Sequence, residues 1–439
     1  MRLSLHRRFT VPVAFAAIAG LTLAGCSGGP GSTNSDAGAE GDGTVTVYGT
    51  ISETEADLLE ESWADWEKEN KIDIQYEASR EFEAQISIRA QGGSAPDIAI
   101  FPQPGLMADL ASRDFLKPAS KAVEDNVDEF WSEDWKAYGT VDGTLYGAPL
   151  MASVKGFIWY SPAKFKEWGV EVPKTWDDLL AVTKTIQEKT DKAPWCAGFS
   201  SGEASGWPGT DWIEDLVLRQ AGPETYDKWV ANEIPFTDPA IKSAFDSVGE
   251  ILLNPEYVNA GFGDVKSINS TPFGDVATPL ADGTCALHHQ ASFFDGFIVD
   301  AGGEVGPDAD VWAFVTPAAE EGSQAVTGGG EIVAAFSDDA DTQKVQEYLS
   351  SAEWANSRVG LGGVISANSG LDPAKATSPI LQEAIKILQD PETTFRFDGS
   401  DLMPGAVGSG TFWKGMVNWI NGAPTDEVLT SIEAGWPSN

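Results

Sequence analysis

The chain is 439 residues long and carries 28 Lys and Arg against 67 Asp and Glu, a net charge of −39 at pH 7. A surface this negative repels nucleic acid and anionic lipid headgroups, so we expect no nucleic-acid partner. The length is too great for a single hydrophobic core and suits two domains.

The N-terminus has the parts of an export signal. Three arginines lie within the first eight residues, and residues 11–23 form an apolar stretch too short to span a membrane as a helix. Small residues then precede Cys26, as in a bacterial lipobox. We therefore expect residues 1–25 to be a signal peptide and Cys26 to carry a lipid anchor outside the cell membrane. An ordinary signal peptide with an incidental cysteine is the alternative.

A tether and a first αβ region follow. Residues 26–43 are mostly small or polar, which predicts a flexible tether. Three strands alternating with helices predict a parallel sheet with helices on both faces. The strands are expected at 44–48, 72–76 and 97–101, and the helices after Ser52 and at 82–90. Ser52 and Glu55 match a capping box at the first helix.

A second αβ region is expected from about residue 155. Its predicted helices are 176–189, 212–220 and 239–253, its predicted strand is 285–289, and further elements follow at 325–336, 412–420 and 426–434. Crossings near 150–155, 300–312 and 362–368 would join two lobes by a multi-segment hinge, with a ligand between them. The predicted N-terminal lobe is 44–152 with 312–362, and the predicted C-terminal lobe is 153–311 with 363–439.

Cys196 and Cys285 are the other two cysteines. In an exported protein such a pair favours a disulfide over a metal or catalytic site. The histidines are too few to provide a good base for a catalytic cysteine. His288 and His289 are adjacent and cannot both face one ion from a strand, and no phosphate-binding glycine loop is present. The sequence therefore predicts no metal site, no cofactor and no catalytic residues.

Aromatic residues in loops are candidates for binding a sugar. Trp207 and Asp211 lie on a turn leading into a helix, and Trp413 follows a long glycine loop. A pyranose packs its C–H face on an aromatic ring and needs paired donors and acceptors for its hydroxyls. Packing without ligand contact is the alternative for each ring.

Polar residues at strand ends complete the predicted site. Arg80, Glu81 and Gln103 follow the second and third strands, and Gln290 has the equivalent position in the second region. Glycines at the next strand allow close approach of a ligand to the backbone. These glycines are Gly329 and Gly330.

Several sequence blocks resemble a known family. They are FPQPGL at 101–106, PWC at 194–196, SGWP at 205–208, TDWIED at 210–215, Cys285 with HQASF at 289–293, and TFRFDGSDLMP at 394–404 with Phe412-Trp413. Together they resemble the carbohydrate-binding lipoproteins of ABC importers, a maltose-binding-protein-like class, and most of all its alpha-glucoside-binding branch. The sequence departs from the pattern at Gly328-Gly-Gly-Glu331, where maltose binders of this class vary.

The resemblance implies a two-lobe α/β fold of the class II periplasmic-binding-protein type, each lobe a mostly parallel sheet flanked by helices. It implies that Trp413 stacks on a pyranose. The loops expected to line the cleft contain Thr50, Ser52, Gln103, Trp207, Asp211 and Gln290. It also implies a monomeric receptor that delivers an alpha-glucoside such as maltose, trehalose or sucrose to a membrane permease. Both cysteines recur in that branch.

Two other functions remain open at this point. A secreted glycoside hydrolase needs two carboxylates about 5–9.5 Å apart, for which Glu81 and Asp211 can be nominated. A lipoprotein that binds peptide or cell wall is the other alternative.

Overall fold

The computed structural model describes residues 41–259, 263–390 and 392–437. The predicted signal peptide, the predicted lipidation site at Cys26 and nearly all of the predicted tether lie outside these residues. Within the described ranges, no helix is both long and apolar enough to cross a membrane.

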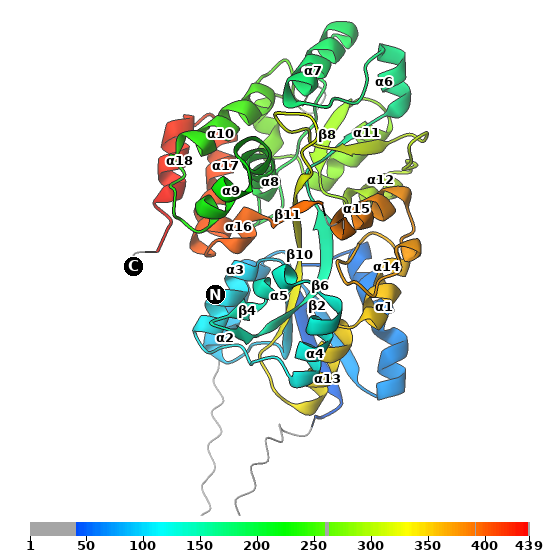
Figure 1. Ribbon diagram of the computed structural model, residues 1–439, viewed down its shortest axis with the longest axis vertical. Coiled ribbons are helices and arrows are strands. Elements are labelled where there is room, and N and C mark those ends of the chain that lie inside the picture. Colours follow the sequence, from blue (N-terminus) through cyan, green and yellow to red (C-terminus); the bar gives the residue numbers. More distant parts are fainter. Residues whose placement is uncertain (1–40, 260–262, 391, 438–439) are drawn as a thin grey trace, which may run out of the picture. The chain divides into compact units, whose positions relative to one another are not determined.

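The first sheet has six strands in the order β11-β10-β3-β1-β2, and β6 also pairs with β10. The strands are β1 (Thr44–Gly49), β2 (Asp73–Ala78), β3 (Ile98–Phe101), β6 (Gly147–Val154), β10 (Ala325–Ala335) and β11 (Thr394–Phe397). As predicted, β1 pairs in parallel with β2 and β3. The long strand β10 runs antiparallel to β3 and β6 and parallel to β11. Figure 1 shows β6 and β10 side by side through the middle of the view.

Alternation along β1 explains why both faces of this sheet are covered. Val45 and Val47 join the core formed with Leu59 of α1, whereas Tyr48 joins a second core with Phe82 of α2. The helices that precede β6 are α1 (Thr54–Asn70), α2 (Phe82–Gly92), α3 (Pro104–Ser112), α4 (Lys121–Phe130) and α5 (Glu133–Tyr138), and the first two after β10 are α13 (Ala340–Leu349) and α14 (Ala352–Gly360). A two-stranded hairpin is formed by β4 (Thr140–Val141) and β5 (Thr144–Leu145).

The second sheet differs from the prediction. It has three strands in the order β8-β7-β9, namely β7 (Phe157–Tyr160), β8 (Leu287–Gln290) and β9 (Trp312–Val315). Both pairings are antiparallel, although a mostly parallel sheet was expected. The remaining helices are α6 (Pro162–Trp168), α7 (Trp176–Thr190), α8 (Trp207–Leu216), α9 (Pro223–Val230), α10 (Pro239–Leu252), α11 (Ala277–Ala281), α12 (Phe294–Asp300), α15 (Pro379–Gln389), α16 (Gly399–Leu402), α17 (Trp413–Ile420) and α18 (Thr425–Glu433).

The chain crosses between the two sheets at segments that bond to one another. The first crossing lies at Lys155 and Gly156, between β6 and β7. The second lies between β9 and β10, after Val315 and therefore later in the chain than the predicted 300–312. The backbone N–H of Lys155 donates to the carbonyl of Thr327 at 2.9 Å, and that of Thr316 donates to Gly156 at 2.7 Å.

Two local predictions need correction. The predicted capping box at Ser52 and Glu55 is not formed, because α1 begins after Glu53, whose φ is 59° and whose side chain makes no capping bond. The helix predicted at 212–220 is longer, starting at Trp207, and its last turn, Val217–Ala221, is a π-helix.

The predicted disulfide joins Cys196 to Cys285, with Cα atoms 5.9 Å apart. Cys196 lies in the segment after α7, and Cys285 lies just before β8. The backbone N–H of Cys196 also donates to the carbonyl of Leu287 in β8 at 3.0 Å. The disulfide and this hydrogen bond together attach the segment after α7 to the second sheet.

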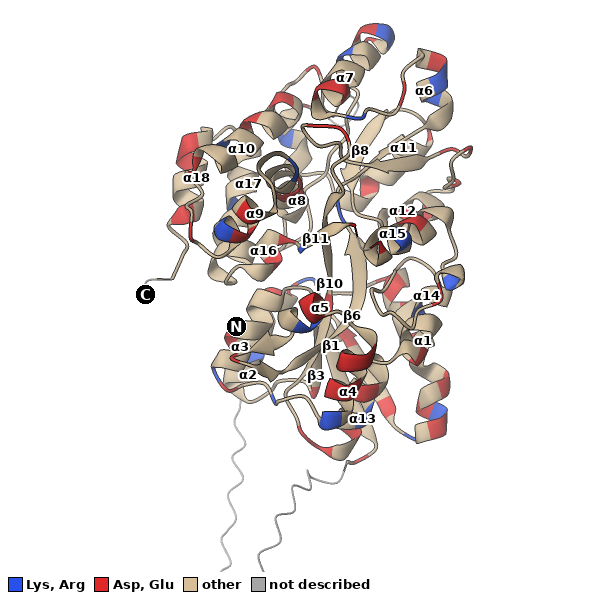
Figure 2. Cartoon of the chain, in the orientation of Figure 1, with Lys and Arg blue, Asp and Glu red and all other residues tan. Residues whose placement is uncertain are grey.

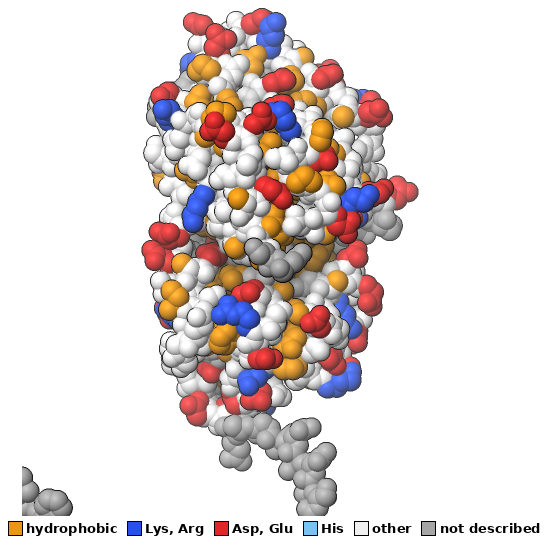
Figure 3. Space-filling model, turned by 90° about the vertical axis from the view of Figure 1, so that its left-hand side faces the viewer, with side chains coloured by type: hydrophobic (Ala, Val, Ile, Leu, Met, Phe, Trp, Pro, Cys, Tyr) orange, Lys and Arg blue, Asp and Glu red, His pale blue; other side chains and the backbone are white. Residues whose placement is uncertain are grey.

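The acidic excess is distributed over the surface. Asp and Glu are spread along the outer helices (Figure 2), and on the face in Figure 3 they do not gather into one patch. Four large hydrophobic side chains are exposed among the described residues: Ile88, Val172, Leu253 and Val299. This pattern is typical of a solvated surface.

Candidate functional site

The centre of the candidate site is an ion-paired lysine at the first crossing. The ammonium of Lys155 lies 2.9 Å from Oδ1 of Asp211 in α8, and it also pairs with Asp398, which follows β11. All three side chains are nearly or fully buried. A buried charge is tolerated only when it is paired and hydrogen-bonded, and Lys155 meets both conditions.

The groups of this cluster differ in how readily each of them carries a charge. Burial alone would lower the pKa of Lys155, but the carboxylates of Asp211 and Asp398 outweigh it and hold the pKa well above its ordinary value. Burial would raise the pKa of Asp398, yet Lys155 brings it down to about 2. Burial raises the pKa of both Asp211 and Glu214 well above the ordinary range. Lys155 and Asp398 are therefore the charged pair, and Asp211 and Glu214 hold protons more readily.

Three carboxyls of this cluster could in principle hold a metal ion. Oxygen atoms of Asp211, Glu214 and Asp398 all lie within 4.8 Å of one another. The cation that contacts two of them is the ammonium of Lys155. The cluster thus carries its own positive charge, and its chemistry gives no reason to assign a metal.

Two of these carboxyls also hold the start of α16. Glu214 accepts the backbone N–H groups of Gly399 and Ser400 at 3.1 and 3.0 Å. Asp398 accepts the N–H of Asp401 at 3.1 Å and the hydroxyl of Ser400 at 2.8 Å. Carboxylates at a helix N-terminus satisfy its free N–H groups, so α8, β11 and α16 are fixed together.

Trp207 lies beside Lys155. The ring is half-buried at the first position of α8. It makes an edge-to-face contact with Phe273, with centroids 5.1 Å apart, and the Lys155 ammonium lies 5.5 Å from its centre. The preceding Gly206 has φ 111°, and a Cβ on it would lie 2.2 Å from the carbonyl oxygen of Trp413. The starts of α8 and α17, where the two predicted ligand-binding rings are attached, are therefore in direct backbone contact. The ring of Trp413 itself is buried, and its Nε1 has no hydrogen-bond partner among the described residues.

The predicted site residues of the first region lie near the ends of β1, β2 and β3. Thr50 and Ser52 are half-buried after β1, whereas Glu81 is exposed beyond β2. Arg80 is also exposed and pairs with Glu53 at 2.6 Å. A Cβ on Gly202 would lie 3.9 Å from the Cβ of Arg80, so this loop comes close to the segment before α8.

Gln103 is buried and lies next to a carboxyl. Its Nε2 donates to Oε1 of Glu83 at 3.0 Å, and its own Oε1 has no partner in the described part of the chain. Burial raises the pKa of Glu83. The helix that begins after Gln103 contacts α16, since a Cβ on Gly105 would lie 2.3 Å from the carbonyl oxygen of Met403.

Gln290, Gly329 and Gly330 are placed differently. Gln290 is fully buried at the end of β8, and its Nε2 lacks a partner among the described residues. A Cβ on Gly329 would lie 3.1 Å from Cε of Lys155, and one on Gly330 would lie 2.3 Å from the carbonyl oxygen of Met151. The close approach predicted for these glycines exists, but this chain's own Lys155 and Met151 make it.

A second buried network supports the crossings. Asp215 of α8 accepts from Nε of Arg219 and from the hydroxyl of Thr327, both at 3.0 Å, and lies 3.4 Å from Nε2 of His289. A Cβ on Gly156 would lie 2.3 Å from the Asp215 carboxylate. His289 thus has a structural partner.

Sequence reasoning missed three charged residues of this region: Lys155, Glu214 and Asp398. Lys155 interrupts the apolar run between β6 and β7, which is a signal that a buried ion pair was needed. Glu214 and Asp398 lie within sequence blocks that carry the family resemblance, but nothing in the sequence pairs them with Lys155.

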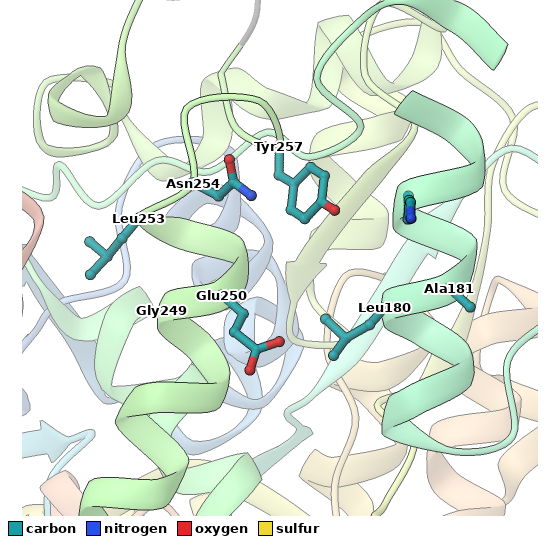
Figure 4. A pocket seen from close by; sticks show the side chains of 8 residues that line it. Leu180, Ala181, Gly249, Glu250, Leu253, Asn254 and Tyr257 are labelled. Carbon is teal, nitrogen blue, oxygen red and sulfur yellow. The ribbon is translucent and has the colours of Figure 1, made fainter. Parts of the chain in front are cut away.

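A hollow of about 510 Å³ lies away from these residues, between α7 and α10. Figure 4 shows Leu180 on one side of it and Glu250 and Tyr257 on the other. It contains none of the predicted site residues and no cluster of polar groups directed at one point, so it is the weaker candidate.

Comparison with known proteins identifies the family of the chain. The model of the family described as bacterial extracellular solute-binding protein matches residues 51–358. The chain is 38% identical over 397 residues to the osmoprotective compounds-binding protein GgtB of Synechocystis sp., with 90% of this chain and 92% of GgtB covered. It is also 38% identical over 414 residues to the alpha-glucosides-binding periplasmic protein AglE of Rhizobium meliloti, with 90% and 87% covered.

Solved structures share the fold. The bacterial solute receptor AcbH has a TM-score of 0.76 at 20% identity, covering 90% of this chain and 98% of AcbH. A chitin oligosaccharide binding protein has a TM-score of 0.75 at 20% identity, covering 89% and 97%. These likenesses confirm the predicted fold class. Because the matching family and the relatives above are binding receptors, the chain is a receptor and not a hydrolase. The chain belongs to the family of bacterial extracellular solute-binding proteins.

Proposed function

We propose that this receptor binds an alpha-glucoside between two closing lobes and delivers it to an ABC permease. The observation that carries the proposal is the half-buried ring of Trp207, with Asp211 and Lys155 beside it. An aromatic face next to charged hydrogen-bonding groups suits a pyranose, which has an apolar face and a rim of hydroxyls.

The relatives narrow the choice of sugar. AglE is named for alpha-glucosides and GgtB for osmoprotective compounds, and this chain is equally similar to both. Trehalose and sucrose are alpha-glucosides that also act as osmoprotectants. They are therefore the first ligands to try, followed by maltose.

Isothermal titration calorimetry tests the proposal. Purified protein is titrated with trehalose, sucrose, maltose, glucose and glycine betaine, the last being an osmoprotectant without a sugar ring. We expect at least one disaccharide to bind in the micromolar range or tighter, and glycine betaine not to bind. Binding of no sugar, or a preference for peptides over sugars, contradicts the proposal.

A variant of the ring links the binding to the site. Trp207→Ala should weaken binding by at least about tenfold, because ring stacking contributes on the order of 1 kcal/mol beyond the area that it buries. Trp168→Ala is the matched control, since Trp168 is also half-buried but lies at the end of α6. Equal affinities of the two variants would place the sugar elsewhere.

We further propose that a lipid on Cys26 holds the protein, as a monomer, at the outer face of the cell membrane. A short tether there keeps the receptor at high local concentration near its permease. Wild-type protein should incorporate labelled fatty acid, and Cys26→Ser should not. Equal labelling of the two proteins contradicts the anchor.

A further inference from the structure

Arg358 of α14 is buried with unused hydrogen-bond donors. The residue is 1% exposed, and Nη1 donates to the carbonyl of Gly362 at 2.7 Å. Nε and Nη2 have no partner among the described residues. A buried guanidinium N–H without an acceptor is costly, so a group that accepts from both nitrogens would stabilise this arrangement.

Two carboxyls lie near this guanidinium without pairing with it. Glu331 follows Gly330 of β10, whose partner Ala152 in β6 bridges to Ile365, just after the loop to which Arg358 donates. Glu55 of α1 and Glu331 of β10 are the acidic groups whose charges act on Arg358. In the described part of the chain, no ion pair within 4.0 Å joins Arg358 to either of them. A single hydroxyl can accept a hydrogen bond from a guanidinium nitrogen and donate one to a carboxylate oxygen. It can therefore bridge a nitrogen and an oxygen about 5 Å apart, which is too far for a direct ion pair.

The loop that follows α14 contacts both Arg358 and Glu55. Gly362 accepts from Arg358, and a Cβ on Gly363 would lie 3.9 Å from Oε1 of Glu55. Both glycines have positive φ, 92° and 77°, so the loop takes a conformation that other residues rarely adopt. Helices α1 and α14 are also in contact.

This cluster is continuous with the site described above. Glu331 directly follows Gly329 and Gly330, and the charge of Lys155 acts on it. The hydroxyl of Tyr76 donates to the carbonyl of Ile51 at 2.9 Å, within the predicted loop of Thr50 and Ser52. Burial raises the pKa of Tyr76, and the charge of Glu331 raises it further. From the second region, the charge of Asp300 at the end of α12 acts on Glu55.

The balance of charge selects a class of ligand. Two carboxyls disfavour an anion, and the guanidinium disfavours a cation at the same place. Neutral hydroxyls fit both, because each can accept from the guanidinium and donate to a carboxylate. A guanidinium edge presents two parallel N–H groups, which matches two adjacent hydroxyls of a pyranose.

We propose that Arg358, Glu55 and Glu331 form a subsite that binds two adjacent hydroxyls of the sugar. The proposal rests on the proposed function and assigns a specific role to Glu331.

The test combines variants with altered sugars. Glu331→Gln, Glu55→Gln and Arg358→Lys keep similar size, and their folding is checked by thermal unfolding. Glu61→Gln, exposed on the same helix as Glu55, and Arg113→Lys, exposed at the end of α3, are the matched controls. The probes are trehalose, sucrose and maltose, together with the monodeoxy analogues of the disaccharide that binds.

At pH 8, above the pKa of Glu331, we expect each site variant to weaken disaccharide binding at least about tenfold, since each alters a hydrogen-bonding group of the subsite, and the controls to have no effect. For the analogue that lacks a hydroxyl held by the subsite, wild type and variant should bind with similar affinity. A structural role alone would weaken binding of every analogue by the same factor, and that result overturns the subsite, as does unchanged affinity. If wild-type protein binds no sugar, the proposed function fails together with the subsite; if it binds and the variants bind equally well, only the subsite fails.

Discussion

The ammonium of Lys155 and the carboxylate of Asp211 lie 2.9 Å apart, although 56 residues separate them in the chain. This hydrogen bond joins the crossing between the two sheets to the helix that begins with Trp207. The position of the ring therefore depends on a side chain located at the crossing.

Replacing this lysine should destabilise the protein strongly. Lys155→Met leaves Asp398 buried without its counter-charge, and breaking a buried pair in this way costs about 3–5 kcal/mol in the free energy of unfolding. Urea denaturation measures the loss. Lys164→Met, at a half-exposed surface position, should change the free energy of unfolding by less than about 0.5 kcal/mol. Lys155→Met with Asp398→Asn should recover part of the loss, and a loss below about 1 kcal/mol for the single variant would contradict the argument.

Alanine substitutions at two glycines with positive φ would show how much stability is lost to backbone strain and how much to steric overlap. Gly302 has φ 83° and a Cβ there would meet nothing within 4 Å, so Gly302→Ala should cost only the strain, about 1–2 kcal/mol. Gly206→Ala adds an overlap with the carbonyl of Trp413 and should cost several kcal/mol or prevent folding. Thermal unfolding of the two variants compares them directly. Equal losses would mean that α8 and α17 can separate freely at this contact.

Breaking the disulfide should lower stability through the unfolded state. The bridge between Cys196 and Cys285 spans 89 residues, and in the chain-entropy model a loop of this size contributes about 4 kcal/mol. Cys196→Ser, Cys285→Ser and the double variant should lose similar amounts in urea denaturation. Wild type treated with a reductant should behave in the same way. A reduced protein as stable as the oxidised one would contradict the prediction.

Glu331 should make stability depend on pH. Burial, then the charge of Glu55, raise the pKa of this carboxyl from 4.5 to about 7. The folded chain therefore binds the proton more tightly than the unfolded chain. This contribution to stability is fully present below pH 4.5 and is lost as the pH rises through 7.

The Glu331→Gln variant isolates that contribution. Other buried carboxyls, such as Asp211 and Glu214, have pKa values raised in the same direction, so the difference between wild type and variant is the quantity to measure. Between pH 4 and pH 8 the stability of the variant should fall by about 3 kcal/mol less than that of wild type. Parallel profiles for the two proteins would show that Glu331 does not titrate as described.

The local elements could be predicted because they depend on nearby residues. Alternating apolar residues located β1, and a spacing of four between Leu59 and Trp63 located the buried face of α1. The antiparallel pairing in the second sheet was not predicted. Strand β7 pairs with strands more than 100 residues away, and a local sequence pattern does not indicate the direction of such a pairing.

Some residues of the candidate site could be predicted from local sequence, and others could not. Trp207 and Asp211 could be found because a ring and a carboxylate on one turn form a local signal. Lys155 and Asp398 were missed because their contact joins residues 243 apart. The unpaired donors of Arg358 also become visible only when α14 is packed in place.

The bond between Cys196 and Cys285 also constrains when this protein matures. Bacterial cytosol keeps thiols reduced, so the bridge forms after the chain has left that compartment. The chain therefore crosses the membrane without its cross-link and acquires it during folding on the far side. The fraction of molecules with free Cys196 and Cys285 thiols would consequently report how much protein is still awaiting export.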